Sequence, residues 1–229
     1  MRSVEARIFE ITQDASGSVT AWIACPPSAV PAPGRYSLAT VVGNSDAVLP
    51  VTLFASQVSE HGFLAASPLP ASWIPGLSLR LRGPLGKGFN LPEGTRRLAL
   101  VTCGDSNSRL AALAQQAAAG GADIAWFTDV PLPPVPAAYE VNPLRLLPEA
   151  LDWADFLALD APLPRLAGLR GVLGIRSEQR LPCPAQVLVY TPMPCGGMAE
   201  CGACAVPARR SWKLACQDGP VFDLDDLDW

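Results

Sequence analysis

Four cysteines near one end of the chain are the residues whose type and spacing most clearly predict chemistry. The sequence has 229 residues and seven cysteines, and the last 35 residues hold four of them. These are Cys195, Cys201, Cys204 and Cys216, separated by five, two and eleven residues. Thiolates grouped in this way bind iron–sulfur clusters or zinc, and an odd total in a chain this long argues against a disulfide framework. We therefore expect a metal centre.

The residues between these cysteines favour a [2Fe-2S] cluster. Small residues fill most positions between the first three: Gly196, Gly197, Ala199, Gly202 and Ala203. A tight loop of small residues lets backbone N–H groups point toward the sulfides of a cluster. Three ligands from one loop and a fourth from a later segment is the plant-type arrangement, although the first gap here is one residue longer. The sequence predicts that the four cysteines hold a [2Fe-2S] cluster.

A zinc ion on the same four cysteines is the alternative. Zinc sites commonly use two pairs of cysteines two residues apart, and only Cys201 and Cys204 form such a pair here. Zinc is therefore less favoured than the cluster, and it would act only as a structural staple. The cysteines outside the group are expected to be ordinary core residues: Cys25, Cys103 and Cys183.

The composition is that of a folded protein with no affinity for nucleic acid. Hydrophobic residues make up 49% and charged residues 17%, and the net charge is −4 with the basic residues scattered singly. No apolar run has membrane-spanning or signal-peptide length, so we expect a cytoplasmic protein without a membrane segment. The single histidine, His61, has no motif around it, which gives little support for a hydrolase.

The hydrophobic pattern divides the chain into a β part and an α/β part. Six short β-rich runs separated by Pro, Gly and Ser predict an antiparallel β-barrel domain over residues 1–94: 6–12, 19–26, 34–42, 48–56, 62–67 and 77–83.

The spacing of hydrophobic residues changes after the predicted barrel. Residues 96–102, 122–128, 155–160 and 185–191 are expected to be strands, and 108–120 and 163–174 helices. This pattern predicts a Rossmann-like parallel-sheet domain over 95–191, whose proline-rich passage forms a loop with one short strand. Residues 192–229 are expected to form a small cysteine-rich subdomain.

With these residues in view, the chain resembles the electron-transfer subunit of class B dihydroorotate dehydrogenase, within the ferredoxin-reductase-like flavoprotein superfamily. The strongest match is residues 216–222, CQDGPVF, and the run 83–89, GPLGKGF, is similar to the loop that closes the barrel in that family. Residues 33–36, PGRY, resemble its Pro-Gly-Gln-Phe element.

The resemblance implies a barrel that holds FAD, a sheet lobe that meets NAD(H), and a cluster that relays electrons to a flavin. That flavin would lie in a partner, a dihydroorotate dehydrogenase-like catalytic subunit of pyrimidine biosynthesis. The positions that the resemblance assigns to FAD are Arg35, Tyr36, Thr52, Gly83, Gly86 and Gly88.

The sequence departs from the family at both dinucleotide sites. The arginine that would pair with the pyrophosphate of FAD is replaced by Leu49, which cannot bind phosphate. The phosphate-binding turn at 102–108 keeps one glycine, and Asp105 or Ser106 is expected to be a helix N-cap there. The Cys-Gly-Pro nicotinamide element is matched only by residues 159–162, LDAP. These changes argue against NAD(H) and leave a second hypothesis open, a non-catalytic accessory subunit with a structural metal.

Overall fold

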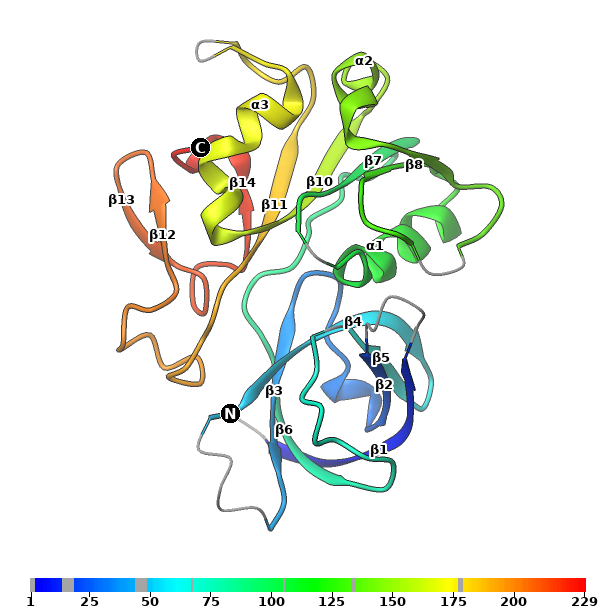
Figure 1. The fold of residues 1–229 in the computed structure, drawn as a ribbon, viewed down its shortest axis with the longest axis vertical. Coiled ribbons are helices and arrows are strands. Elements are labelled where there is room, and N and C mark those ends of the chain that lie inside the picture. Colours follow the sequence, from blue (N-terminus) through cyan, green and yellow to red (C-terminus); the bar gives the residue numbers. More distant parts are fainter. Residues whose placement is uncertain are drawn as a thin grey trace.

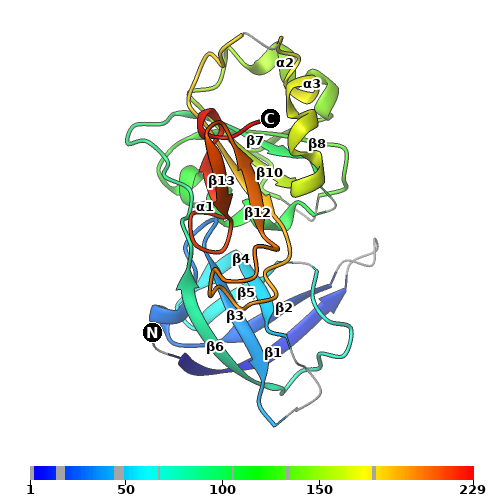
Figure 2. The same ribbon diagram turned by 90° about the vertical axis from the view of Figure 1, so that its left-hand side faces the viewer.

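The protein consists of a β-barrel below an α/β lobe, with the cysteine-rich tail running along one side of both (Figures 1 and 2). The computed structural model describes residues 3–13, 19–43, 49–66, 68–104, 106–132, 135–176 and 179–229. Asp105, one of the two predicted helix caps, lies outside these ranges.

The barrel is closed by six antiparallel strands in the order β1-β2-β5-β4-β3-β6. Their bounds are β1 Ser3–Gln13, β2 Val19–Ala24, β3 Tyr36–Val41, β4 Val51–Ser59, β5 Gly62–Ala65 and β6 Ser78–Leu85. A short 3-10 helix, η1 Pro27–Ala29, joins β2 to β3. Alternate residues of these strands point inward, as Leu79 and Leu81 of β6 do, so the barrel has a core of its own.

The second lobe is a six-stranded sheet in the order β14-β11-β10-β7-β8-β9. The bounds are β7 Arg97–Thr102, β8 Asp123–Thr128, β9 Glu140–Asn142, β10 Phe156–Pro162, β11 Ala185–Tyr190 and β14 Val221–Asp223. The strands are parallel except β14, which runs antiparallel to β11. The strand order reverses between β7 and β10, so this is the topological switch point of the sheet.

Helix α1, Ser108–Ala119, lies between the sheet and strand β4 of the barrel (Figure 1). Its apolar face packs on the sheet, and the chain leaves the helix at Gly120 and Gly121 as the sequence predicts. The N-cap is Asn107, one residue later than predicted, while the hydroxyl of Ser106 accepts a hydrogen bond from the N–H of Ser108. The other helical segments are short: η2 Leu144–Leu146, α2 Leu147–Ala150, η3 Leu163–Gly168 and α3 Leu169–Leu173.

The cysteine-rich tail is tied to the second lobe by its last strand. It contains the hairpin β12 Ala205–Ala208 and β13 Ser211–Leu214, then β14, then the 3-10 helix η4 Leu224–Asp226. The chain ends in an acidic segment, residues 223–228, which folds back on the β12–β13 hairpin. Lys213 Nζ lies 2.7 Å from Asp226, and Arg209 lies 3.4 Å from Asp225. These charges are therefore engaged with each other.

One continuous apolar core joins the barrel, the sheet and the tail. It includes Tyr36 and Phe54 of the barrel, Val187 of the sheet, and Cys204 and Cys216 of the tail. The predicted fold class, an antiparallel barrel with a Rossmann-like lobe and a C-terminal cysteine-rich region, is confirmed. The limits of the three domains stay predictions. Within the described ranges, no helix has the length and apolar character needed to cross a membrane.

Candidate metal centre

The first three cysteines lie on a loop whose backbone turns repeatedly through left-handed conformations. Gly196, Gly197 and Gly202 have φ angles of 64°, 76° and 69°. Ala199, at 63°, is the one residue other than glycine with positive φ in the described part of the chain. Glycine adopts this region without the strain that a Cβ introduces. The small residues between the cysteines therefore allow a tight loop, whereas larger side chains at these positions would strain its backbone.

The four thiols come together as two pairs. The thiol of Cys195 lies near that of Cys201, and the thiol of Cys216 near that of Cys204, because Cys201 affects the pKa of Cys195 and Cys204 affects that of Cys216. The pairs are close enough for the charge of Cys195 to act on Cys216. Cys204 and Cys216 are buried, Cys195 is half-buried and Cys201 is exposed. The site therefore extends from the core of the protein to its surface.

The pairing bears on which metal fits. Among the described residues, no group of three or more His, Cys, Asp or Glu side chains is placed to hold one metal ion. That finding does not distinguish zinc from iron, and four thiolates are also a donor set that zinc takes. A two-iron cluster takes two cysteines on each iron, so it needs two neighbouring pairs. Cys195 with Cys201 and Cys204 with Cys216 would supply those pairs, and the donor set fits a two-iron cluster.

Backbone N–H groups of the loop point at the first thiol. Burial raises the pKa of Cys195, whereas the hydrogen bond from Cys201 lowers it. The N–H groups of Met198, Glu200 and Ala199 lower it further, and the pKa falls to about 6. Hydrogen bonds to a thiolate stabilise the charged form, which is the form that binds metal. The loop thus presents a ready thiolate near neutral pH.

The fourth cysteine is positioned by a tyrosine of the barrel. The hydroxyl of Tyr36, on β3, donates a 2.8 Å hydrogen bond to the backbone carbonyl of Cys216, 180 residues away in the sequence. Tyr36 is fully buried. Burial raises the pKa of the Cys216 thiol to about 12, and the neighbouring Cys204 contributes to the rise. The predicted FAD contact of Tyr36 stays a prediction; its hydroxyl ties the tail to the barrel.

Replacing Tyr36 with phenylalanine should destabilise the protein. The Tyr36→Phe variant keeps the ring but leaves the Cys216 carbonyl without its buried donor, which costs about 1–3 kcal/mol. The free energy of unfolding, measured with urea on the full chain, should fall by that amount. Tyr139→Phe, in the sheet lobe, is the matched control and should change stability by less than about 0.5 kcal/mol. Equal losses in the two variants would contradict the role of the Tyr36 hydroxyl.

The approach of the loop to the barrel predicts different effects for two glycines. A Cβ on Gly197 would lie 2.9 Å from the Tyr36 hydroxyl oxygen, whereas a Cβ on Gly202 would meet nothing within 4 Å. Both residues have positive φ, so alanine strains the backbone by about 1–2 kcal/mol in each case. Gly197→Ala must also displace the loop from Tyr36. We expect the Gly197→Ala variant to lose most of its bound iron and the Gly202→Ala variant to retain its iron. Iron analysis of the purified variants measures this difference. Equal iron retention in the two variants would contradict the packing of the loop on Tyr36.

Two of the positions predicted to bind FAD, Arg35 and Gly86, lie at the joint between the barrel and the tail. Arg35 donates from Nε to the carbonyl of Gly86, at 3.1 Å, and from Nη2 to that of Pro84, at 3.0 Å. A Cβ on Gly86 would lie 2.6 Å from the carbonyl oxygen of Gly219, so this glycine is needed for close packing of the two segments. The guanidinium of Arg35 is thus engaged within the chain.

The remaining predicted positions contact other segments of the chain. Gly83 packs against Ser37, and Gly88 packs against Pro33. Thr52 lies on β4, opposite Leu38 of β3 and apart from this joint. Leu49, at the position of the missing phosphate ligand, is 56% exposed. A dinucleotide pyrophosphate needs a cation or free N–H groups, and neither Leu49 nor the engaged guanidinium of Arg35 supplies the cation here. The assignment of these positions to FAD stays a prediction.

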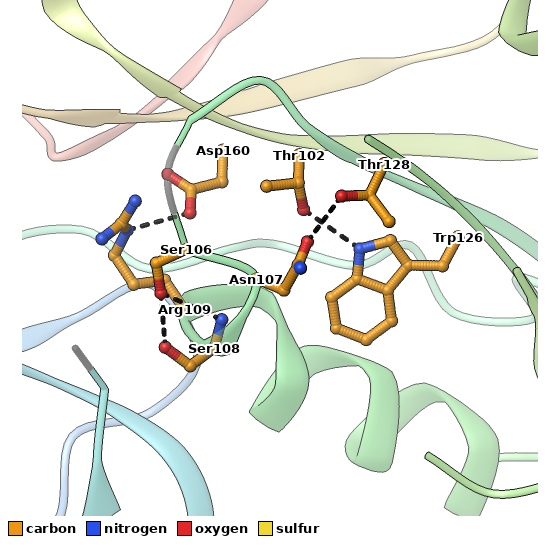
Figure 3. Close-up of polar contacts among 8 residues, drawn as sticks. All are labelled: Thr102, Ser106, Asn107, Ser108, Arg109, Trp126, Thr128 and Asp160. Atoms are coloured by element: carbon orange, nitrogen blue, oxygen red, sulfur yellow. Dashed lines mark hydrogen bonds and ion pairs between the residues drawn. The ribbon is translucent and has the colours of Figure 1, made fainter. Parts of the chain in front are cut away.

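The switch point of the sheet is filled by a buried ion pair (Figure 3). Arg109 of α1 lies 2.9 Å from Asp160 at the end of β10, and the two side chains are only 3% and 0% exposed. The guanidinium carbon also lies 4.3 Å from the ring centroid of Tyr190. Burial raises the pKa of Asp160, and Arg109 opposes the rise. Dinucleotides bind sheets of this kind at the carboxyl ends of the strands beside the switch point, where this chain places its own side chains.

A second polar cluster closes the neighbouring turn. The Asn107 amide donates to the carbonyls of Val130 and Pro131 and accepts from the hydroxyl of Thr128, while Trp126 Nε1 donates to Thr102. Among the described residues, these groups form hydrogen bonds with one another at the position of the phosphate-binding turn. The sequence argument against NAD(H) binding stays a prediction.

Comparison with known proteins agrees with this geometry at the tail. Residues 191–228, which contain all four cysteines, match the family described as the iron–sulfur cluster binding domain of dihydroorotate dehydrogenase B. The tail is similar to iron–sulfur domains of this type. The match confirms the resemblance inferred from residues 216–222. No curated protein sequence matches the chain significantly.

Solved structures show the same fold over nearly the whole chain. An NADH-dependent reduced ferredoxin–NADP oxidoreductase, from work on flavin-based electron bifurcation, aligns with a TM-score of 0.75 at 17% identity, over 97% of this chain and 89% of that one. The Amycolatopsis cytochrome P450 reductase aligns at 0.59 and 14% identity, over 83% and 70%. Ferredoxin-NADP+ reductase from Plasmodium falciparum aligns at 0.57 and 10%, over 82% and 96%. The iron–sulfur domain is thus attached to a ferredoxin-reductase-like fold.

Several residues that shape the site were not identified as such from the sequence. Nothing in the pattern relates Tyr36 to Cys216. An aspartate inside an apolar run, as Asp160 is, signals a buried carboxylate that needs a partner, and Arg109 at the start of an apolar helix is a candidate for that partner.

Proposed function

We propose that the chain is an electron-transfer subunit that carries a [2Fe-2S] cluster on Cys195, Cys201, Cys204 and Cys216. The observation that carries the proposal is the arrangement of these thiols as two adjacent pairs. The match of residues 191–228 to an iron–sulfur cluster binding domain supports it. When bound, such a cluster accepts and releases one electron at a time.

The protein supplies the surroundings that such a cluster needs. The N–H groups around Cys195 stabilise its thiolate, and the buried Cys204 and Cys216 anchor one side of the site in the core. Cys201 is exposed, so the other side of the site is open to a partner. By resemblance, we propose that the partner is a dihydroorotate dehydrogenase-like catalytic flavoprotein. The proposal does not include FAD or NAD(H), because Leu49 replaces the expected phosphate ligand and the Arg109–Asp160 pair occupies the switch point of the sheet.

A reductive titration tests the proposal. We expect anaerobically purified protein to take up about one electron per chain from dithionite, with reversible bleaching of its visible absorption and a paramagnetic signal from the reduced form. The reduced protein should be reoxidised by a dihydroorotate dehydrogenase catalytic subunit in its flavin-loaded form. Absence of any reducible chromophore would contradict electron transfer, while reduction without reoxidation would contradict only the partner.

The filled switch point favours a second candidate function, that of a non-catalytic accessory subunit. In this candidate function a structural zinc ion holds the tail. This candidate rests on the filled dinucleotide crevice and on Leu49. Its expected result in the same titration is a colourless protein with no electron uptake.

A further inference from the structure

Two arginines of β6 line a cavity beside the cysteine loop. The cavity has a volume of about 380 Å³ and lies between the outer face of the barrel and the loop, with Cys195 and Gly196 in its wall. Leucines alternate with arginines along β6, and because the leucines fill the barrel, Arg80 and Arg82 point outward. Figure 2 shows the segment after β11 descending across β3 and β6. The barrel thus presents positive charge to the loop.

Arg82 is the arginine that touches the loop. A Cβ on Gly196 would lie 3.1 Å from Arg82 Nη2 and 4.0 Å from its Cζ, so the guanidinium contacts the residue next to Cys195. Burial raises the pKa of Tyr36, and the charge of Arg82 opposes that rise. The Tyr36 hydroxyl is in turn bonded to the carbonyl of Cys216, so the charge of Arg82 lies near a residue that positions the fourth cysteine.

Within the described part of the chain, no carboxylate lies within ion-pair distance of Arg82. Its neighbours across the two adjacent strands are Ser3 and Leu38, which are neutral. Arg80, two residues earlier, also forms no ion pair among the described residues, but its cross-strand neighbour on β1 is the carboxylate-bearing Glu5. Arg82 is also half-buried, so water screens its charge less than that of a fully exposed side chain.

We infer that Arg82 raises the reduction potential of the cluster on the four cysteines. Reduction adds one negative charge to the cluster, and a nearby guanidinium, which stays protonated, stabilises the reduced form more than the oxidised one. Net charge around an iron–sulfur cluster is one of the factors that set its potential. Arg82 is a positioning residue: it touches the loop and acts on the electron acceptor without being a ligand. The inference rests on the proposed function.

The test compares midpoint potentials of the full chain, measured by spectroelectrochemical titration of the cluster absorption. Arg82→Gln and Arg82→Met remove the charge and should shift the midpoint potential to more negative values. Arg82→Lys keeps the charge and should stay near the parent protein. Arg80→Gln removes a charge from the same strand and the same cavity, but one that faces Glu5, and it should produce a smaller shift.

Each outcome decides the inference. Equal potentials in Arg82→Gln and the parent protein, or an equal shift in Arg80→Gln, would overturn a specific role for Arg82. Loss of iron from both neutral variants would also overturn it, because Arg82 would then be holding the loop rather than tuning the cluster. Failure of the proposed function is distinguishable, since the parent protein would then show no iron–sulfur absorption to titrate.

Discussion

Changing Cys204 to alanine should abolish the iron–sulfur centre. Cys204 is 1% exposed and its thiol is paired with that of Cys216. Removing it leaves one iron with a single protein ligand, which cannot hold a two-iron cluster. We expect Cys204→Ala to lose essentially all bound iron and sulfide, together with the visible absorption, and to expose the tail to proteolysis because metal binding and folding of such a segment are coupled.

Cys183→Ala is the matched control for this change. Cys183 is half-buried, lies outside the cysteine group, and has a pKa raised by burial to about 11, so it is a poor thiolate and a poor ligand. The control should retain the full complement of iron and sulfide. Retention of iron by Cys204→Ala, or equal loss in the control, would contradict the ligand assignment.

Breaking the buried ion pair at the switch point should cost the most stability of any substitution considered. Arg109→Met removes the ion partner of the Asp160 carboxylate, which stays fully buried. The other oxygen of that carboxylate, Oδ1, already has no hydrogen-bond partner among the described atoms. Removing one member of a buried pair costs about 3–5 kcal/mol. The free energy of unfolding in urea should fall by that amount.

A double variant separates the ion pair from simple packing. Arg109→Met with Asp160→Leu replaces both charges by apolar groups, and such replacements are often neutral or stabilising. We expect the double variant to recover most of the lost stability, giving a coupling of several kcal/mol in a double-mutant cycle. A single variant that loses less than about 1 kcal/mol, or additive losses in the double variant, would contradict the role given to this pair.

Local patterns in the sequence were sufficient for the barrel, the sheet and the cysteine group. The alternation in residues 77–83 places leucines inside and arginines outside, which the burial along β6 confirms. The apolar runs at 96–102 and 155–160 have the continuous hydrophobicity of strands buried on both faces, and both lie inside the sheet. The ligand assignment itself stays a prediction until metal is measured.

The contacts between distant segments could not be predicted from such patterns. Strand β14 has three residues, too few to show a period, and its pairing with β11 depends on where the hairpin directs the chain. The hydrogen bond from Tyr36 to Cys216 joins residues 180 positions apart. The sequence also did not predict that Gly86, which was assigned to a cofactor site, lets the barrel loop pack closely on the tail at Gly219.

Metal and sulfide analysis of anaerobically purified protein, combined with its visible spectrum, tests the central claim most directly. The account predicts about two iron ions and two acid-labile sulfides per chain, with charge-transfer bands that bleach on reduction. A colourless protein that contains about one zinc ion per chain and no sulfide would contradict it and leave the structural subunit as the better description.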